Sequence, residues 1–415
     1  MSAKHADATN LPHFVGIDIG TTVVRCVVGA LNQSGEPEII GYGSSANQGM
    51  RKGVITHVEE VANAVIAAIN EAERHSGRLV NNATVNINGA HVSGVNSKGV
   101  IAISAANREI TNEDRYRVEE AAAIMQLPAN REIIQVFPKS YSLDGQENIK
   151  DPVGMHGVRL EVDTHIVTAS TPSVKSLENA LEKAQVHAKH RTVSSLAAAE
   201  AVLNRQQKEA GTVVIDIGAG TTNIVVIEDG EVQHVAVVPM GGTHITNDLA
   251  IGLKTDLDIA EQVKLEHANL SGKNHRAIAA VMQGKTQHTF NADDVRMIIE
   301  ARVEELFEFV DKELKKINRS RKLPGGAVIV GATAKMPGLA DFAKEQLQLP
   351  ARVGQLLPIG GLSDISDDSS YVSAIGLMLL DMILDASGQS GYDSESVSLI
   401  KSLSGILGKF CRSND

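Results

Sequence analysis

Two copies of one short motif have the residue types needed to bind phosphate. Residues 15–30 (VGIDIGTTVVRCVVGA) and 213–230 (VVIDIGAGTTNIVVIEDG) each read as an apolar run, Asp-Ile-Gly, a pair of threonines and a second apolar run. This pattern predicts two β-strands joined by a tight turn. Glycine lets the backbone approach a ligand closely, and threonine hydroxyls and backbone N–H groups can donate to phosphate oxygens. The candidate residues are Asp18, Gly20, Thr21, Thr22, Asp216, Gly218, Gly220, Thr221 and Thr222.

The aspartate beside each turn suits a hydrated Mg²⁺ that bridges phosphates. Asp18 and Asp216 are therefore expected to hold Mg²⁺ through water. For one motif alone, a structural hairpin whose aspartate bonds its own turn is an equal alternative. Two copies at positions 18 and 216, which are 198 residues apart, favour phosphate binding. The repeat also predicts two similar α/β domains that face each other.

Two further glycine turns could contact the rest of a nucleotide. Gly331 and Ala332 lie between a predicted strand and a predicted helix, where backbone N–H groups could contact a ribose or an α-phosphate. Gly242 precedes another predicted helix, and Glu261 and Lys264 share one face of the helix that follows. That pair could hold a ribose and an adenine. The alternatives are an ordinary strand-to-helix loop for Gly331 and a solvated ion pair for Glu261 and Lys264.

The first half of the chain alternates strand and helix patterns around these turns. A strand is expected at 38–43 and a helix at 58–74, and the mixed pattern of 82–162 predicts an inserted α/β subdomain with a polar helix near 111–126. The segment THIVTAS predicts a strand that returns to the first domain.

Helices follow that strand and then dominate much of the second half. They are expected at about 174–187, 194–206, 245–318 with a break around 270–292, and 371–386. The expected boundaries are 12–82 and 164–210 for the first domain, 83–163 for the insertion, 211–243 and 326–386 for the second domain, 244–325 for its helical subdomain, 387–395 for a linker and 396–412 for a terminal helix.

The terminal segment has the pattern of an amphipathic helix that lies on a membrane. Its apolar residues fall within an arc of about 120° when placed on a helix, and basic residues lie outside that arc. A basic patch on a chain of net charge −11 indicates an anionic surface nearby. A helix that packs back on the protein's own core is the alternative. The residues expected to contact the membrane are Leu399, Ile400, Lys401, Leu403, Ile406, Leu407, Lys409 and Phe410.

Composition excludes several other classes of protein. The net charge of −11 and the scarcity of aromatic residues (5 Tyr, 7 Phe, no Trp) argue against a nucleic-acid partner. The two cysteines, Cys26 and Cys411, form neither a disulfide framework nor a zinc spacing. The polar first residues lack the apolar core of a signal peptide, and no run approaches the roughly 18 apolar residues of a membrane span. A reducing cytoplasm is the simplest compartment.

The order of DIGTT, DIGAGTT and VGATAKMPG resembles the actin-type ATPase superfamily. Longer segments are similar to the FtsA family of bacterial cell-division proteins over about residues 12–410: QGMRKGVITHVEE, IKDPVGMHGVRLEV, VPMGGTHITNDLAIGL, DIAEQVK, GLADFAKEQL and SSYVSAIGLMLL. This resemblance implies an actin-like duplicated ATPase fold: two ribonuclease-H-like α/β domains, an α/β insertion in the first half and a C-terminal amphipathic helix.

The same resemblance implies a function in cell division. It implies ATP and Mg²⁺ as cofactors, self-polymerisation, binding of FtsZ and contact with other divisome proteins. It also implies peripheral attachment to the cytoplasmic side of the inner membrane at the division septum. On this basis FtsZ is expected to contact the helical region 244–325, and self-association is expected to use the insertion.

Three departures from the family pattern bear on activity. Val23 stands where a lysine is common, which predicts one phosphate contact fewer, and Ala332 replaces the second glycine of the third turn. Ser194 and Ser195 occupy the neighbourhood where related ATPases place a Glu or Gln that orients water. ATP binding with weak or absent hydrolysis is therefore expected, and no catalytic residue is assigned.

Two other functions fit the same superfamily. A small-molecule kinase would need an aspartate base in a sugar-sized cleft, and the sequence offers no clear candidate. A pilus-assembly ATP-binding scaffold with a similar insertion would not be expected to end in a tethered amphipathic helix.

Overall fold

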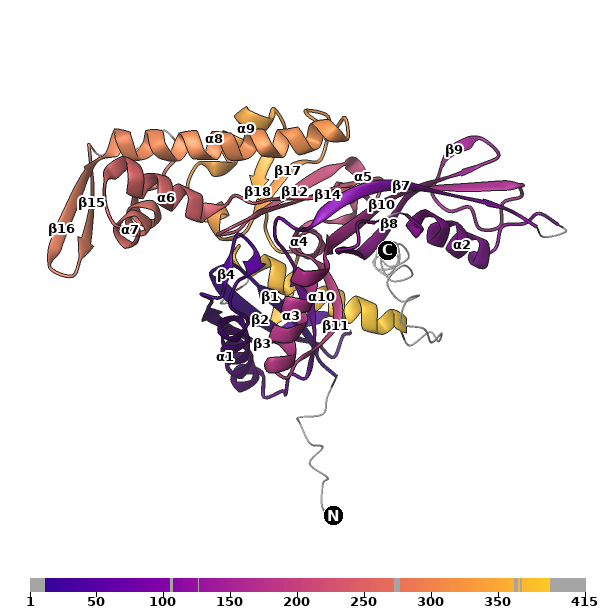
Figure 1. Cartoon of the computed structure of the whole chain (residues 1–415), viewed down its shortest axis with the longest axis horizontal. Helices are drawn as coiled ribbons and strands as arrows, with labels where there is room; N and C mark the ends of the chain where they lie inside the picture. The colour runs from indigo at the N-terminus through magenta and orange to yellow at the C-terminus, as the bar shows by residue number, and fades with distance from the viewer. Residues whose placement is uncertain are drawn as a thin grey trace, which may run out of the picture.

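The computed structural model describes residues 12–104, 107–125, 127–271, 277–361, 365 and 368–388 (Figure 1). The expected terminal helix at 396–412 lies outside the described residues, as does the expected linker at 387–395 apart from its first two residues. Among the helices of the described part, none is long and apolar enough to cross a membrane.

The first domain is built on a six-stranded sheet of order β11-β6-β1-β2-β3-β19. Strands β1, β2 and β3 form consecutive antiparallel hairpins, and β6 and β11 run parallel to β1. The strands are β1 Phe14–Ile19, β2 Val23–Leu31, β3 Pro37–Ala46, β6 Asn82–Ile87, β11 His187–Val193 and β19 Gly360–Gly361, and a small hairpin pairs β4 Met50–Arg51 with β5 Val54–Ile55.

Two helices cover opposite faces of this sheet at close range. Helix α1 (Val58–Ser76) buries Val61, Val65 and Ile69 against β2 and β3. A Cβ at Gly43 would lie 2.1 Å from the carbonyl oxygen of Ala68 in α1, which explains the glycine there. The other face contacts α10 (Val372–Gly388), because α10 packs on β1, β2 and β6.

The second domain repeats this arrangement. Its sheet has the order β14-β13-β12-β17-β18, again with two antiparallel hairpins followed by strands parallel to the first one. The strands are β12 Thr212–Ile217, β13 Thr222–Glu228, β14 Glu231–Val238, β17 Gly326–Val330 and β18 Ala351–Val353. A tight turn at residues 228–231 (EDGE) joins β13 to β14, and its central residues Asp229 and Gly230 have positive φ angles of 56° and 80°. The repeated topology confirms the expected duplicated α/β fold.

The insertion is a separate sheet of order β7-β10-β8-β9, and helix α2 packs on β7 and β10. Its elements are β7 Ser93–Ala102, α2 Asn112–Ala123, β8 Arg131–Leu143, β9 Gln146–Ile149 and β10 Arg159–Ser170. The expected boundary at residue 83 lies inside β6, which pairs with β1 of the first domain. The expectation that THIVTAS returns to the first domain is wrong, because these residues belong to β10, which pairs with β7 and β8 in the middle of the insertion sheet.

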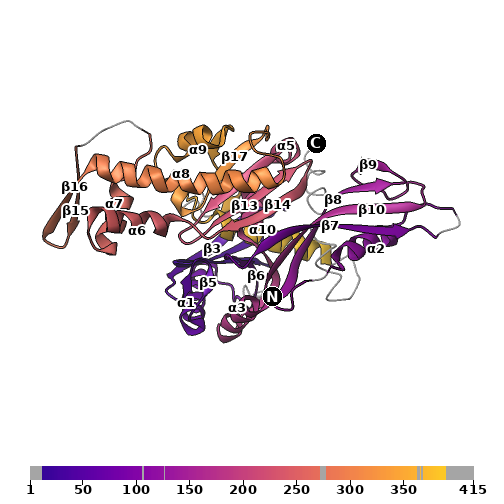
Figure 2. The ribbon, with the colours of Figure 1, turned by 45° about the horizontal axis from the view of Figure 1, so that its top comes forward.

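The chain re-enters the first domain through α3 (Thr171–Lys183) and β11, and reaches the second through α4 (Ser194–Val202) and α5 (Arg205–Ala210). The helical subdomain contains α6 (Gly242–Leu253), α7 (Leu257–His267) and α8 (Ala292–Lys316). The expected break in that region is a β-hairpin of β15 (Ile278–Gln283) and β16 (Thr286–Asn291). The short helix η2 (Ala332–Lys335) and α9 (Leu339–Leu347) follow β17. The insertion and the helical subdomain extend from opposite ends of the molecule (Figures 1 and 2).

Helix α10 was expected within the second domain, but it packs against the first. Asp381 in α10 accepts hydrogen bonds from the backbone N–H of Val15 (3.0 Å) and from the hydroxyl of Thr84 (2.9 Å). On its other side α10 contacts α4, which packs on β12 and β13. These two helices therefore lie between the two sheets (Figure 2) and place the hairpin turns of the two domains opposite each other.

Candidate functional site

The turns at residues 18–22 and 216–222, whose residue types suit phosphate, lie opposite each other; we call them the phosphate-type turns. Each begins with a glycine N–H that donates to a backbone carbonyl three residues later, from Gly20 to Val23 at 3.1 Å and from Gly218 to Thr221 at 2.9 Å. A Cβ at Gly220 would lie 2.7 Å from the hydroxyl oxygen of Thr21. The structure therefore brings the repeated motifs together at one place between the domains.

The two aspartates lie at the ends of matched strands, β1 and β12. Asp18 accepts a hydrogen bond from the amide of Asn86 (2.7 Å), and Asp216 accepts bonds from Asn223 (3.4 Å) and Ser373 (3.2 Å). Burial, with the negative charge of Asp216 as a second cause, raises the pKa of Asp18 to about 7. Burial also raises the pKa of Asp216. Because the negative charge of Asp216 raises the pKa of Asp18, the two carboxylates would gain from a cation between them.

Arg25 supplies a positive charge that the sequence reasoning missed. In the register of β1 and β2 it is the direct partner of Asp18, so the two side chains lie on the same face. Its guanidinium lies 5.3 Å from the ring centroid of Tyr371 and lowers the pKa of both Asp18 and Asp216. Although Val23 replaces the usual lysine, the site has a cation. If the two apolar runs on either side of Gly20 are paired as an antiparallel hairpin, Arg25 falls opposite Asp18, and this register could have indicated the cation from the sequence.

The third glycine turn, at Gly331 and Ala332, packs closely against Asp216. Gly331 has a φ of 90°, and a Cβ at this position would lie 2.5 Å from a carboxylate oxygen of Asp216. The Gly331 N–H donates to the carbonyl of Ser369 (3.2 Å), whose hydroxyl donates back to the Gly331 carbonyl (3.1 Å). The methyl group of Ala332, at the start of η2, belongs to an exposed residue. Only glycine fits position 331 without moving the carboxylate.

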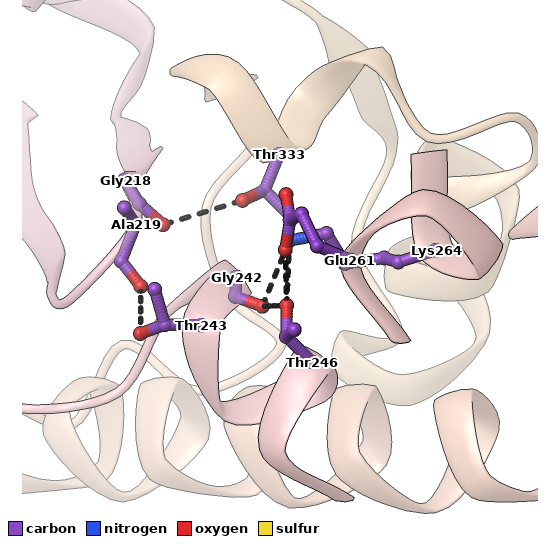
Figure 3. A network of polar contacts seen from close by, with 8 residues as sticks. All are labelled: Gly218, Ala219, Gly242, Thr243, Thr246, Glu261, Lys264 and Thr333. Carbon is purple, nitrogen blue, oxygen red and sulfur yellow. Dashed lines mark hydrogen bonds and ion pairs between the residues drawn. The ribbon is translucent and has the colours of Figure 1, made fainter. Parts of the chain in front are cut away.

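Gly242, Glu261 and Lys264 form one connected network with the second turn (Figure 3). The Gly242 N–H donates to the carbonyl of Gly218 at 2.9 Å. Lys264 donates to the Gly242 carbonyl (3.2 Å), to the hydroxyl of Thr246 (2.9 Å) and to the Glu261 carboxylate (2.7 Å). The Lys264 side chain is only 12% exposed, whereas that of Glu261 is 42% exposed. Glu261 and Lys264 are therefore connected through Gly242 to the second phosphate-type turn, and the alternative of a simple solvated ion pair does not describe them.

The remaining candidates have different surroundings. Thr22 is exposed, whereas Thr222 is buried and its hydroxyl donates to the carbonyl of Met240 (2.8 Å), so this threonine supports the turn. Ser194 accepts a hydrogen bond from Asn86 (2.9 Å), and the hydroxyl of Ser195 is buried without a partner among the described residues. The eight residues expected to contact a membrane lie outside the described part of the chain.

The described residues hold no group of three or more His, Cys, Asp or Glu side chains that could bind a metal ion. Mg²⁺ does not need such a group, because it keeps several waters and takes one or two carboxylates together with phosphate oxygens. Asp18 and Asp216 fit that requirement.

Comparison with known proteins identifies the family. The model described as "SHS2 domain inserted in FTSA" matches residues 89–168, and the model "Cell division protein FtsA" matches residues 213–376. The cell division protein FtsA of Pseudomonas aeruginosa is 32% identical over 91% of this chain and 91% of its own length. That of Bacillus subtilis is 36% identical over 88% of this chain and 82% of its own length. The chain belongs to the FtsA family of cell division proteins.

Solved structures show the same fold at lower identity. The PilM–PilN type IV pilus biogenesis complex matches with a TM-score of 0.64 and 16% identity over 89% of this chain and 98% of that one. MreB5 of Spiroplasma citri bound to ADP matches with a TM-score of 0.55 and 13% identity over 91% and 99%. These matches confirm the actin-like fold that the motif order predicts. The insertion match beginning at residue 89 agrees with the sheet topology, in which β6 belongs to the first domain.

Proposed function

We propose that the chain binds ATP with Mg²⁺ between its two domains. The observation that carries this proposal is the meeting of the two glycine-threonine turns beside Asp18, Asp216 and Arg25. Backbone N–H groups and hydroxyls of the turns suit the phosphates, and Arg25 suits their negative charge. Bound Mg²⁺ neutralises charge between phosphates and carboxylates. The MreB5 structures bound to ADP and AMPPNP share this fold and add support.

The Gly242, Glu261 and Lys264 network suits the ribose and base of the same nucleotide. The network is joined to the phosphate-type turn by the bond from Gly242 to Gly218. The third turn, at Gly331 and Ala332, closes the opposite side against Asp216. With no carboxylate or amide at Ser194 and Ser195, hydrolysis is expected to be slow.

In the cell, we propose, the protein polymerises and tethers FtsZ to the cytoplasmic membrane at the division septum. Membership of the FtsA family supports this role. The insertion, from the end of β6 to the start of α3, is proposed for self-association, and the helical subdomain 244–325 for FtsZ. Residues 396–412 are proposed to bind the membrane through their apolar arc and their lysines. Other divisome proteins are further proposed partners.

Calorimetry with purified protein tests the nucleotide site. ATP with Mg²⁺ is expected to bind the unaltered chain, and Asp216→Ala or Gly331→Ala is expected to abolish binding. The second change forces a methyl group against the Asp216 carboxylate. Gly360→Ala is the control, because a Cβ there meets its nearest atom at 3.3 Å. Equal binding by all four proteins rules out the site.

Co-sedimentation with liposomes, with and without FtsZ, tests the tether. FtsZ is expected in the pellet only when this protein and liposomes are both present. Charge reversals at Glu304 and Glu308, exposed positions on α8, are expected to reduce recovery of FtsZ without reducing recovery of the protein itself. If no exposed position on α8 affects FtsZ, its binding surface lies elsewhere. Phosphorylation of glucose or glycerol by the purified protein would support the kinase alternative.

A further inference from the structure

A small hollow lined by both polar and apolar side chains lies at the carboxyl end of β6. Its lining includes Gly53, Asn86, Asn88 and His91, with apolar walls from Ile19, Met50, Ile55, Ile87 and Leu177. The space open to the centre of a water molecule is about 20 Å³. An ordered water needs roughly 10–15 Å³ of such space and two to four polar partners. The hollow therefore has the size of a water site.

Three lining residues are each one hydrogen bond away from the candidate phosphate site. The Gly53 N–H donates to the hydroxyl of Thr21 (3.2 Å). Asn88 accepts from the hydroxyl of Thr221 (3.4 Å), and Asn86 donates to Asp18 (2.7 Å). The lining of the hollow is thus joined by single hydrogen bonds to both turns and to the first carboxylate.

The strand order explains why these groups meet. Strands β1, β6 and β11 are parallel, so their carboxyl ends lie at one edge of the sheet. This edge carries Asp18, then Asn88 just after β6, and Ser194 just after β11. Ligands bind at such edges of α/β sheets because side chains from several strands converge there.

His91 is the unexplained residue of this hollow. Both of its ring nitrogens are buried, and neither has a hydrogen-bond partner among the described residues. Buried polar atoms without a protein partner are commonly satisfied by ordered water. Burial, with the charge of Arg131 as a second cause, lowers the pKa of His91, so the ring is neutral near pH 7 and one nitrogen can accept a hydrogen bond.

The backbone that carries this ring is held in place. Arg131 donates to the carbonyl of His91 (3.1 Å) and to the hydroxyl of Ser93 (2.6 Å). On the other side, a Cβ at Gly89 would lie 2.8 Å from the His91 ring, and Gly89 itself has a φ of 127°. A neutral ring on a held backbone, beside a water-sized space, can accept a hydrogen bond from a water molecule and orient it.

We propose that His91 and Asn88 hold an ordered water in this hollow and that His91 orients it for attack on the terminal phosphate of ATP. The water oxygen forms a bond to the terminal phosphorus, and the bond from that phosphorus to the bridging oxygen breaks, with its electron pair remaining on ADP. One proton of the water stays on the released phosphate and the other goes to solvent. This step rests on the proposed ATP site, and it assigns to the loop after β6 the water-orienting role that related ATPases give to a Glu or Gln in the neighbourhood of Ser194 and Ser195.

The test compares the unaltered chain with His91→Ala, His91→Gln and the control His187→Ala, which alters an exposed histidine of β11. ATP binding by calorimetry is expected to change less than twofold in all variants. The single-turnover rate of ATP hydrolysis is expected to fall about 100-fold in His91→Ala. It is expected to fall about tenfold in His91→Gln, whose amide oxygen can still accept from water, and not at all in the control.

Binding of ADP with aluminium fluoride gives a second readout, because this complex mimics the transferring phosphate together with the attacking water. The unaltered chain is expected to bind it more tightly than ADP alone, and His91→Ala is expected to lose that difference. The inference is overturned if the unaltered chain binds ATP without hydrolysing it, or if His91→Ala hydrolyses ATP at the unaltered rate. Failure of the unaltered chain to bind ATP would instead overturn the proposed function, and this inference with it.

Discussion

Asp18 and Asp216 carry negative charge into a partly enclosed space, and the cost of that charge depends on pH. The pKa of Asp18 is raised from 3.8 to about 7 in the folded protein, mainly by burial and then by Asp216. Below about pH 4 the carboxyl is protonated in both folded and unfolded chains. Between about pH 4 and pH 7 the unfolded chain ionises this carboxyl while the folded chain keeps it protonated, so the free energy of unfolding falls across this range and stays lower above it.

We therefore expect Asp18→Asn to stabilise the nucleotide-free protein at pH 8 and to have little effect near pH 4. A full shift from 3.8 to about 7 corresponds to about 4 kcal/mol, and because the cleft admits solvent we expect roughly 1–3 kcal/mol. Urea unfolding of both proteins across this range measures the difference. Asp341→Asn, on an exposed position of α9, is the control. A stabilisation that is the same at pH 4 and pH 8 would contradict the coupling.

Arg25 offers a direct test of what the site is built to bind. Arg25 lies opposite Asp18, and its Nε atom is buried without a partner among the described residues. A charge-assisted bond to phosphate is worth about 1.5–3 kcal/mol, so Arg25→Met should weaken ATP binding by roughly 10- to 100-fold. Calorimetry with Lys322→Met, an exposed cation, provides the matched control. Unchanged affinity in Arg25→Met would show that this arginine serves the two aspartates alone.

Among the elements, the crossing of α4 and α10 fixes the spacing between the domains. A Cβ at Gly376 in α10 would lie 1.8 Å from the carbonyl oxygen of Ala197 in α4. Gly376→Ala must therefore separate the two helices, and we expect a loss of about 3 kcal/mol in the free energy of unfolding. Urea unfolding measures this loss, with Gly360→Ala as the control. An effect below about 0.5 kcal/mol would mean that the crossing can relax.

The elements that carry the turns could be predicted, whereas their partners could not. Alternating apolar residues around Gly20 and Gly218 indicate hairpins because the period of a strand is two residues. Strand β11 (HAKHRTV) was not predicted, since it lies at the edge of the sheet and four of its seven residues are basic. The docking of α10 on the first domain depends on bonds from Val15 and Thr84 to Asp381, more than 290 positions away in sequence. Local patterns carry no information about such contacts.

The same limit applies to the candidate site. Asp18, Gly20 and Gly218 belong to a repeated motif and could be found from spacing alone. Asn86 and Ser373 reach the two aspartates only because separate segments fold against each turn, and neither lies in a repeated pattern. Arg25 lies between these cases, because the register of one hairpin decides whether it faces Asp18 or the opposite side of the sheet.

At the scale of the whole molecule, the insertion is connected by the chain to the first domain and also packs against β14 of the second domain. His165 of β10 accepts a hydrogen bond from the backbone N–H of Val235 in β14 (2.9 Å) and pairs with Asn96 (2.8 Å). Its ring lies 5.3 Å from that of His234, which contacts Glu313 of α8 (3.1 Å). Burial lowers the pKa of His165 to about 3, so this contact is made by a neutral ring. A polymer built through the insertion would therefore transmit force to both domains.

The proposed polymerisation would also govern how firmly the proposed tail binds a membrane. Six apolar side chains at about 1.5–3 kcal/mol each give a gross gain on the order of 10 kcal/mol. Helix ordering, partial immersion and lost translational freedom oppose much of that gain. Gly405 and Gly408 each cost roughly 1 kcal/mol of helix stability. A single copy should bind reversibly, and a polymer should bind firmly, because each later contact forms at a high effective concentration.

Leu403→Glu puts a charge in the middle of the apolar arc and should release the protein into the soluble fraction without changing its ATP affinity. Lys401→Glu should weaken binding mainly to anionic vesicles, and high salt should have the same effect on the unaltered protein, because salt screens the attraction between lysines and lipid headgroups. Flotation with neutral and anionic vesicles separates these contributions, and Ser402→Ala is a control within the same segment. If the Leu403→Glu protein floats as well as the unaltered chain, the tail is not the membrane anchor. The tether would then have to be sought in the folded domains.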